Sequence, residues 1–273
     1  MPRLPRRGAP ATTGAMIRDP FLPMQGIHNF RDYGGYETRD GRRVRTGLLY
    51  RSGQHVEAED ADLAAIDALG IRTVIDLRGE SERTRNPCRR SDGFDAEVIY
   101  HPGETTSSPP HEDVGSTAVT ADYARQRMTA VYTRMPENPA MISMFSRFFQ
   151  ALDQNEGASL VHCFAGKDRT GIAASMVLHV LGVPHESIER EFLLTNDAPT
   201  LEVLKRQSLP GIEARIGKLD EDAVRSLLEV RREYLHTYLD RVTASHGSFD
   251  AYLTQAIGVD DAMRARLKAR FVE

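Results

Sequence analysis

The sequence predicts an α/β fold in which helices flank a central, mainly parallel sheet. Apolar runs at 71–77 and 159–163 are typical of strands that are buried inside a sheet. Segments with apolar residues at helical spacing alternate with these strands, as in layered domains built on parallel sheets. The chain has 273 residues, of which 40% are hydrophobic and 27% are charged, an ordinary composition for a folded globular protein.

Apolar periodicity and the positions of glycine and proline give the order of the elements. Glycine-containing pairs break residues 25–53 into two or three short strands, of which "LLYRS" at 48–52 is the clearest. The elements that follow are a helix at 57–70, a strand at 71–77, a short polar helix at 79–87, a strand at 96–101, helices at 119–135 and 138–154, a strand at 159–163 and a buried helix at 170–182.

The C-terminal third is predicted to be helical and to pack onto the sheet. Its strongest segment, 220–243, reads as one helix because apolar residues recur near i, i+3, i+4 and i+7. Segments 248–258 and 260–273 follow as further helices. The stretch 102–117, rich in Pro, Ser, Thr and Gly, has no periodic pattern and is predicted to be a long loop.

Residues 1–22 are predicted to form a disordered tail, and residues 23–273 a single domain. The tail has arginines but lacks the apolar segment of a Sec-type signal peptide. No apolar run reaches the roughly 18 residues of a membrane span. We therefore expect no integral membrane association, and either a cytoplasmic protein or one exported without a Sec-type signal peptide.

Charge and cysteine content exclude several other classes of function. The net charge of −4 and the pI near 6.2 give no general attraction for nucleic acid, so any anion must be bound at a local site. Cys88 and Cys163 are the only cysteines, and neither has zinc-binding spacing, so we expect no metal and no other cofactor. The sequence leaves the oligomeric state open.

One stretch, "LVHCFAGKDRTGIAAS" at 160–175, places Cys163 between a strand and a helix. Gly166 allows the tight turn that leads to Arg169. The amides of the loop and of the first helical turn favour an anion, and the same field favours the nucleophilic thiolate of Cys163. Arg169 can bind two phosphoryl oxygens with its planar fork. These residues suit a tetrahedral phosphorus that the thiolate attacks.

The neighbours of Cys163 complete the predicted site. The phosphate is expected to lie against Phe164, Ala165, Gly166, Lys167, Asp168 and Arg169. Thr170 is expected to donate its hydroxyl to the sulfur, His162 to fix the loop by bonding its backbone, and Lys167 to add a second cation at the rim. A buried structural thiol is the alternative for Cys163, but the register of its neighbours favours a nucleophile.

These residues carry a resemblance to a known family. "HCFAGKDRTG" resembles the H-C-x5-R-[ST] signature of the cysteine-dependent protein tyrosine phosphatases, and "AGKDRT" is similar to a bacterial branch of that family. "NFRDYGG" at 29–35, "LLYRSG" at 48–53 and, more loosely, "VIDLRGESER" at 74–83 match the same branch. The resemblance therefore covers most of the chain after residue 25 and implies a phosphatase-like fold.

The resemblance implies a two-step reaction without a metal. Cys163 would take the phosphoryl group, and water would then hydrolyse the phosphocysteine. It also implies phosphotyrosine as a substrate, often with phosphoserine, phosphothreonine and phosphoinositides. A lid is a further feature of the resembled branch, and the loop at 102–117 with part of the helices after Pro199 are the candidates for it.

The general acid is open among three candidates. The chain has no tryptophan, so the Trp-Pro-Asp loop of many relatives is absent in its usual form. Asp168 is the first choice, as the resembled branch implies. Asp76 is the second, because it ends a predicted strand at the sheet edge where α/β proteins build sites. The acidic loop at 111–114 is the third.

Other functions remain as alternatives. A rhodanese-like sulfurtransferase also holds a cysteine in an anion-binding loop, but such loops are typically shorter and lack the Arg-Thr pair. A non-catalytic phosphate-binding module would usually have lost Cys163 or Arg169. A P-loop nucleotide enzyme is excluded, since Val161 and Asp168 stand where glycine and Ser or Thr are needed.

Overall fold

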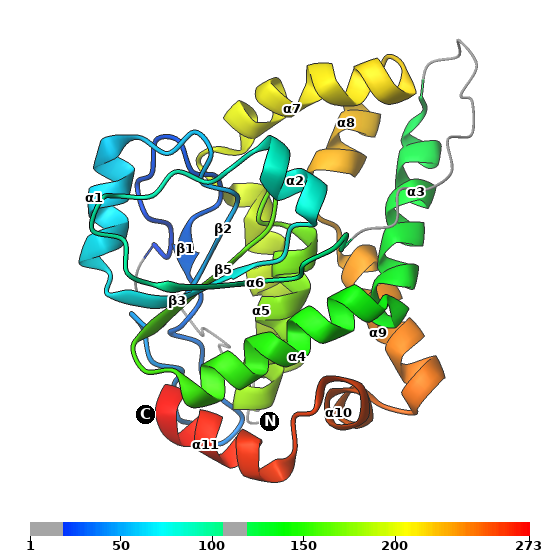
Figure 1. The fold of residues 1–273 in the computed structure, drawn as a ribbon. Helices are drawn as coiled ribbons and strands as arrows, with labels where there is room; N and C mark the ends of the chain where they lie inside the picture. Colours follow the sequence, from blue (N-terminus) through cyan, green and yellow to red (C-terminus); the bar gives the residue numbers. More distant parts are fainter. Residues whose placement is uncertain (1–18, 106–118) are drawn as a thin grey trace, which may run out of the picture.

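A five-stranded sheet forms the centre of the computed structural model, which describes residues 19–105 and 119–273 (Figure 1). The strands are β1 Arg31–Asp32, β2 Leu49–Ser52, β3 Ile71–Asp76, β4 Glu97–Tyr100 and β5 Ala158–His162. Their order is β1-β2-β5-β3-β4, and neighbours are parallel except for β1 and β2. The predicted mainly parallel sheet is confirmed.

Helices flank this sheet and make up most of the C-terminal half (Figure 1). They are α1 Asp60–Ala68, α2 Glu80–Arg85, α3 Ala121–Arg134, α4 Pro139–Gln154, α5 Asp168–Leu181, α6 His185–Leu193, α7 Leu201–Ile216, α8 Glu221–Leu228, α9 Arg232–His246, α10 Phe249–Tyr252 and α11 Asp261–Phe271. Short turns of other helical types are Met135–Glu137, Leu194–Asp197 and Leu253–Ile257. None of the helices in the described part of the chain is long and apolar enough to cross a membrane.

Alternate side chains of the strands pack against helices on the two faces of the sheet. Successive residues of the inner strands enter opposite hydrophobic clusters: Leu49, Ile75 and Val161 the larger, and Tyr50, Val74 and Leu160 the smaller. The larger cluster includes side chains of α4 and α5, and the smaller includes those of α1. Because each buried side chain of this size stabilises the fold by about 1.5–3 kcal/mol, the strand pattern fixes which helix covers which face.

The prediction of one helix over 220–243 is wrong, because the chain breaks between α8 and α9 at residues 229–231. Glu229 is extended, with φ −97° and ψ 166°. The Asn196 side chain replaces the helical partners of Val230, donating to its carbonyl and accepting from its N–H, both at 2.8 Å. Val230 is buried at the break. A tertiary contact thus overrides a continuous apolar pattern.

The predicted lid is described only in part. Its loop residues from 106 to 117 lie outside the described residues. Figure 1 places α7 and α8 toward the same end of the molecule as α2. The hydroxyl of Thr200, just before α7, accepts a hydrogen bond from the Asn29 N–H at 3.2 Å, and Gln207 bonds His28 at 2.9 Å. Closure of these helices over the site stays a prediction.

Candidate active site

Residues 163–169, which we call the signature loop, join β5 to α5 at the carboxyl end of the sheet. Cys163 follows the last strand residue and is buried, with 3% of its surface exposed. Gly166 has a φ of +69°, and a Cβ there would lie 2.4 Å from the Ser52 carbonyl carbon and 2.5 Å from the Gly53 nitrogen. The loop therefore packs against the end of β2 in a shape that only glycine permits at this position.

The carbonyl groups of the signature loop point into the scaffold. The Gly166 carbonyl accepts hydrogen bonds from Asn29 Nδ2 and Arg51 Nη2, both at 2.8 Å. The Phe164 carbonyl accepts one from the Gln54 N–H at 2.9 Å. Among the described residues, none accepts a hydrogen bond from the backbone N–H groups of 164–167. A set of unbonded amides beside a cysteine is the arrangement that binds an oxyanion.

A buried ion cluster holds those carbonyl contacts in place. Glu191 of α6 accepts from Arg31 Nε at 2.9 Å and from Arg51 Nη1 at 2.8 Å. All three side chains are fully buried. Burial would raise the pKa of Glu191, but the two guanidinium groups lower it, so the carboxylate stays charged. Removing one member would leave an unpaired buried charge, at a cost of about 3–5 kcal/mol.

Sequence reasoning from single residues missed this cluster. Arg31 and Arg51 stand in "NFRDYGG" and "LLYRSG", the two stretches that carried the family resemblance outside the loop. Glu191 lies 160 residues after Arg31 and has no motif of its own. The two matched stretches therefore contained both arginines, but only the folded chain shows that they share Glu191 as a partner.

Arg169 is held by a carboxylate of α2. Its Nη1 and Nη2 donate to the two carboxylate oxygens of Glu82 at 2.6 and 2.8 Å. Nη1 also contacts the Leu77 carbonyl at 3.1 Å and the Thr105 hydroxyl at 3.2 Å. No residue in the described ranges accepts a hydrogen bond from Nε, so the Nε/Nη2 edge is available to two phosphoryl oxygens. Glu82 was not among the predicted site residues.

Cys163 and Arg169 interact electrostatically. Burial alone would lower the pKa of Arg169, but the hydrogen bonds to Glu82 and the electrostatic interaction with Cys163 raise it. The guanidinium is therefore a permanent cation beside the sulfur. A cation in that position stabilises both a thiolate and the phosphoryl group that the thiolate would receive.

Asp168 is the first residue of α5 and lies next to Arg169. Its Oδ1 accepts a hydrogen bond from the Tyr132 hydroxyl at 2.7 Å and pairs with Lys167 Nζ at 3.0 Å. Within the described chain no donor binds Oδ2. The side chain is 22% exposed. One oxygen is thus fixed by two donors, while the other has none among the described residues.

Tyr132 reaches Asp168 from α3. It is fully buried and stacks on Tyr234 of α9, with ring centroids 5.4 Å apart. Burial, together with the Asp168 charge, raises the pKa of Tyr132 well above its usual value. The phenol therefore stays protonated and acts as a hydrogen-bond donor to Oδ1.

Lys167 does not lie at the rim, where it was expected. Its side chain is only 5% exposed, and its ammonium contacts Asp168 at 3.0 Å and the Glu229 carbonyl at 3.5 Å. The residue is a buried partner of Asp168 at the break between α8 and α9. An attraction for additional phosphate groups would have to come from other cations.

Asp76 ends β3, as predicted, but Arg78 already binds both of its carboxylate oxygens. Arg78 donates to both carboxylate oxygens, at 2.9 Å from Nε and 2.7 Å from Nη2. Burial would raise the pKa of Asp76, but the charge of His162 and the Arg78 hydrogen bonds lower it from 3.8 to about 2. A carboxyl group with that pKa holds no proton at neutral pH, so Asp76 is poorly suited to act as the acid.

His162 and Thr170 flank the reactive segment. His162 is fully buried, and its Nδ1 lies 3.4 Å from the Cys163 carbonyl, a long contact in the direction that was expected. Burial lowers the pKa of His162 from 6.5 to about 4, so it is neutral. The hydroxyl of Thr170 is buried and bonds none of the described residues. The donation from Thr170 to the sulfur stays a prediction.

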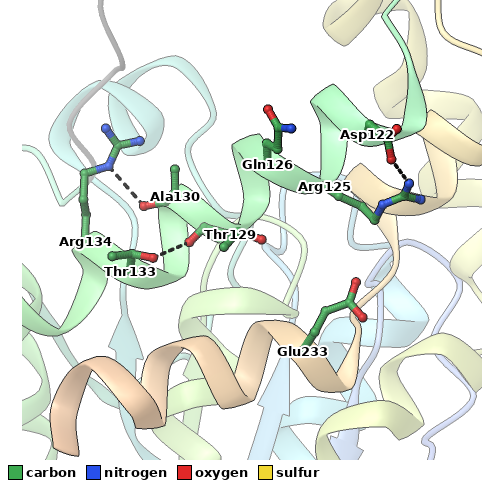
Figure 2. Close-up of a pocket in the computed structure, with 8 residues that line it drawn as sticks. All are labelled: Asp122, Arg125, Gln126, Thr129, Ala130, Thr133, Arg134 and Glu233. Carbon is green, nitrogen blue, oxygen red and sulfur yellow. Dashed lines mark hydrogen bonds and ion pairs between the residues drawn. The ribbon is translucent and has the colours of Figure 1, made fainter. Parts of the chain in front are cut away.

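A hollow on the outer face of α3 is not part of this site. Figure 2 shows its lining residues: Asp122, Arg125, Gln126, Thr129, Ala130, Thr133, Arg134 and Glu233. Most of its polar groups bond one another, as Arg125 does Asp122 (Figure 2). Tyr132 belongs instead to the buried face of the same helix. The active site is therefore defined by the signature loop and not by this hollow.

The comparison with known proteins identifies the family. The tyrosine phosphatase family matches residues 22–273 of the chain. The chain belongs to the tyrosine phosphatase family. A protein of Cupriavidus necator that is named as a tyrosine-protein phosphatase is 31% identical, and the match covers 93% of this chain and 90% of that protein.

A second relative and one solved structure also match the chain of this phosphatase. The triple specificity protein phosphatase PtpB of Mycobacterium tuberculosis is 28% identical, with 90% of this chain and 96% of that protein covered. The crystal structure of TpbA from P. aeruginosa is 16% identical over 73% of this chain and 89% of that chain, with a TM-score of 0.29.

Proposed function

We propose that the phosphatase hydrolyses phosphate monoesters, phosphotyrosine among them, through a phosphocysteine on Cys163. One observation carries the proposal: the loop that begins at Cys163 holds the N–H groups of 164–167 and the Nε/Nη2 edge of Arg169, and neither those N–H groups nor Nε has an acceptor among the described residues. Together they supply donors for the oxygens of one phosphoryl group. The family match supports the phosphatase activity, and the site residues supply the mechanism.

In the first step the Cys163 thiolate attacks phosphorus. The sulfur–phosphorus bond forms while the bond from phosphorus to the leaving oxygen breaks. Asp168 gives its proton, carried on Oδ2, to that oxygen, while Oδ1 keeps its hydrogen bond to Tyr132. Arg169 and the loop amides bind the equatorial oxygens throughout, so their charge is stabilised in the transition state.

In the second step water hydrolyses the phosphocysteine. The Asp168 carboxylate takes a proton from the attacking water, and the sulfur–phosphorus bond breaks to return the thiolate and release phosphate. The predicted hydrogen bond from Thr170 would stabilise the leaving sulfur. Its buried hydroxyl, unbonded among the described residues, is available for that contact.

The proposal extends to phosphoserine, phosphothreonine and phosphoinositides. The support is the relative from M. tuberculosis, whose name describes it as having triple specificity. We propose phosphorylated proteins or phosphoinositides as the partners of the active site. A panel of phosphotyrosine, phosphoserine and phosphothreonine peptides beside mono- and bis-phosphorylated inositol lipids tests this breadth, and activity on phosphotyrosine alone would contradict it.

Hydrolysis of para-nitrophenyl phosphate tests the chemistry itself. The wild-type protein should turn over, and Cys163→Ser should lose essentially all activity while it still binds vanadate or phosphate. A folded wild-type protein without turnover would overturn the proposal in favour of a phosphate-binding module. Sulfur transfer from thiosulfate to cyanide, measured in parallel, would reveal the rhodanese-like alternative.

A further inference from the structure

Three metal-binding side chains meet where α6 contacts α9, away from the signature loop. His185 and Glu189 are four residues apart in α6 and therefore share one face of the helix. His236 approaches them from α9, 47 residues after Glu189. A donor atom of each residue lies within 4.8 Å of those of the other two. This separation along the chain explains why the sequence showed no metal-binding spacing.

The distances are close to those of a zinc site. Glu189 Oε2 lies 3.3 Å from His236 Nε2 and 3.9 Å from His185 Nε2. In a tetrahedral site with bonds of about 2.0–2.1 Å, neighbouring donors lie about 3.4 Å apart. The first contact fits already, and the second needs a small rotation of an exposed side chain.

Exposure allows an ion to enter and leaves room for water. The His185 and His236 side chains are 51% and 44% exposed, while Glu189 is only 8% exposed. The two imidazole rings lie 5.9 Å apart above this buried carboxylate. A cation would therefore bind between the rings, on the carboxylate, with its fourth position open to solvent.

Among the described residues, Arg232 is the one cation that already contacts the cluster. Its Nε lies 2.5 Å from Glu189 Oε1, whereas the histidines face Oε2. The two oxygens of Glu189 thus serve different partners. Arg232 is 66% exposed, so solvent screens its charge. It would hold the carboxylate in place, as outer-shell partners do in metal sites.

A second cluster, Asp76, Cys88 and His162, does not qualify. Arg78 donates to Asp76 at 2.7 Å and to Cys88 at 3.1 Å, so an ion there would displace or face a buried guanidinium. His162 is also fully buried, and solvent does not reach it. The α6–α9 cluster has neither obstacle.

We propose that His185, Glu189 and His236 form a binding site for a divalent transition metal of the zinc class. Two imidazoles and one carboxylate match the ligand preference of such ions, while Mg²⁺ prefers oxygen ligands. The ion would link α6, which carries Glu191, to α9. The inference is independent of the proposed phosphatase chemistry, because none of the three residues belongs to that site.

Calorimetric titration of the full chain with ZnCl₂ tests the site. The background is Cys88→Ser with Cys163→Ser, so that thiolates cannot bind the ion. One equivalent of Zn²⁺ should bind per chain and raise the melting temperature, and EDTA should reverse the rise. Mg²⁺ at the same concentration should do neither.

Single substitutions locate the ion. His185→Ala and His236→Ala should each weaken zinc binding by more than about 100-fold, since even outer-shell changes cost 10–100-fold. His246→Ala, in the same helix as His236, is the matched control and should bind normally.

Two results would overturn the proposal. One is the absence of zinc binding by the parent chain. The other is stoichiometric binding that persists in both histidine variants, which would place the ion elsewhere. Circular dichroism of each variant confirms the fold, and loss of fold is unexpected for two half-exposed side chains. Visible absorption of bound Co²⁺, lost in both variants, provides a second measure of the same ligands.

Discussion

Asp168 and Asp76 lie at the same end of the sheet, yet their surroundings suit them to different roles. Asp76 is 4% exposed, and Arg78 binds both of its oxygens. Asp168 is 22% exposed, and its bonds from Tyr132 and Lys167 both go to Oδ1. Both oxygens of Asp76 are bound, whereas Oδ2 of Asp168 has no donor among the described residues. Proton transfer needs the second arrangement, and a rigid scaffold is better served by the first.

The largest expected effect is on catalysis, which should depend on Asp168. Asp168→Asn should lower kcat by about 10²–10⁴-fold on a substrate with a poor leaving group, because no proton reaches the departing oxygen. The loss should be smaller with para-nitrophenyl phosphate, whose leaving group needs little assistance. Steady-state kinetics on phenyl phosphate and para-nitrophenyl phosphate measure both. A loss that does not depend on the leaving group would contradict the assignment of Asp168 as the acid.

The stability of the fold should instead depend on Asp76. Asp76→Asn should lower the free energy of unfolding by about 3–5 kcal/mol, because Arg78 would remain buried without its carboxylate. Asp40→Asn is the matched control: its ion pair with Arg42 is exposed and screened by solvent, so its loss should cost far less than that of the buried pair. Urea unfolding measures both. Equal losses in the two variants would show that the buried Asp76–Arg78 pair contributes no more to the free energy of unfolding than the exposed pair does.

At acidic pH, the change of the free energy of unfolding with pH should reflect the buried groups around Asp76. Burial, only partly offset by Asp76, lowers the pKa of His162 from 6.5 to about 4. Between these values the unfolded chain binds a proton that the folded chain excludes, so stability falls as the pH drops through this window. The contribution of His162 is about 3 kcal/mol. Asp76, with a pKa of about 2, stays ionised throughout and keeps its own contribution.

Urea unfolding at about pH 7 and about pH 4.5 measures this loss. His55, which stacks on His162 at 5.2 Å, also has a lowered pKa because it is buried, so it adds to the slope. His162→Asn should remove part of the pH dependence. If the variant and the parent lose the same free energy, His162 does not titrate as its burial requires.

The smallest expected effect concerns the phenol that holds Asp168. Tyr132→Phe should lower kcat about tenfold, since a hydrogen bond to a charged group is worth about 1.5 kcal/mol or slightly more. KM should change little, because Tyr132 lies on Asp168 and not among the loop amides. Tyr238→Phe is the matched control, as its buried hydroxyl bonds only Tyr252 among the described residues. Unchanged kcat in Tyr132→Phe would show that Tyr132 does not position Asp168, which Lys167 also contacts at 3.0 Å.

Local pattern was enough to predict the sheet and the signature loop. The strands at 71–77 and 159–163 are β3 and β5, each within a residue of its predicted bounds. Helix α5 begins at Asp168, two residues earlier than predicted, so Arg169 is already in its first turn. Buried strands and a buried helix are clear in sequence because most of the residues in them are apolar or small.

Prediction failed where distant segments act on the chain. The apolar pattern of 220–243 is continuous, yet Asn196 breaks it at Val230. Lys167 looks like a surface cation in sequence, yet Asp168 and the Glu229 carbonyl hold it inside. At Val230 the preference of the local sequence is weaker than two hydrogen bonds made by a distant residue, and at Lys167 the fold buries the cation beside its own neighbour in the chain.

The sequence by itself determined the nucleophile candidate, the arginine and the loop between them, because their chemistry depends on spacing over a few residues. Only the tertiary structure showed that Arg78 binds both oxygens of Asp76, while one oxygen of Asp168 has no donor among the described residues. The reason is physical: Tyr132 lies 36 residues before Asp168, and Glu82 lies 87 residues before Arg169. Contacts over such separations set burial and hydrogen bonding, and these in turn decide which groups hold a charge and which can release a proton.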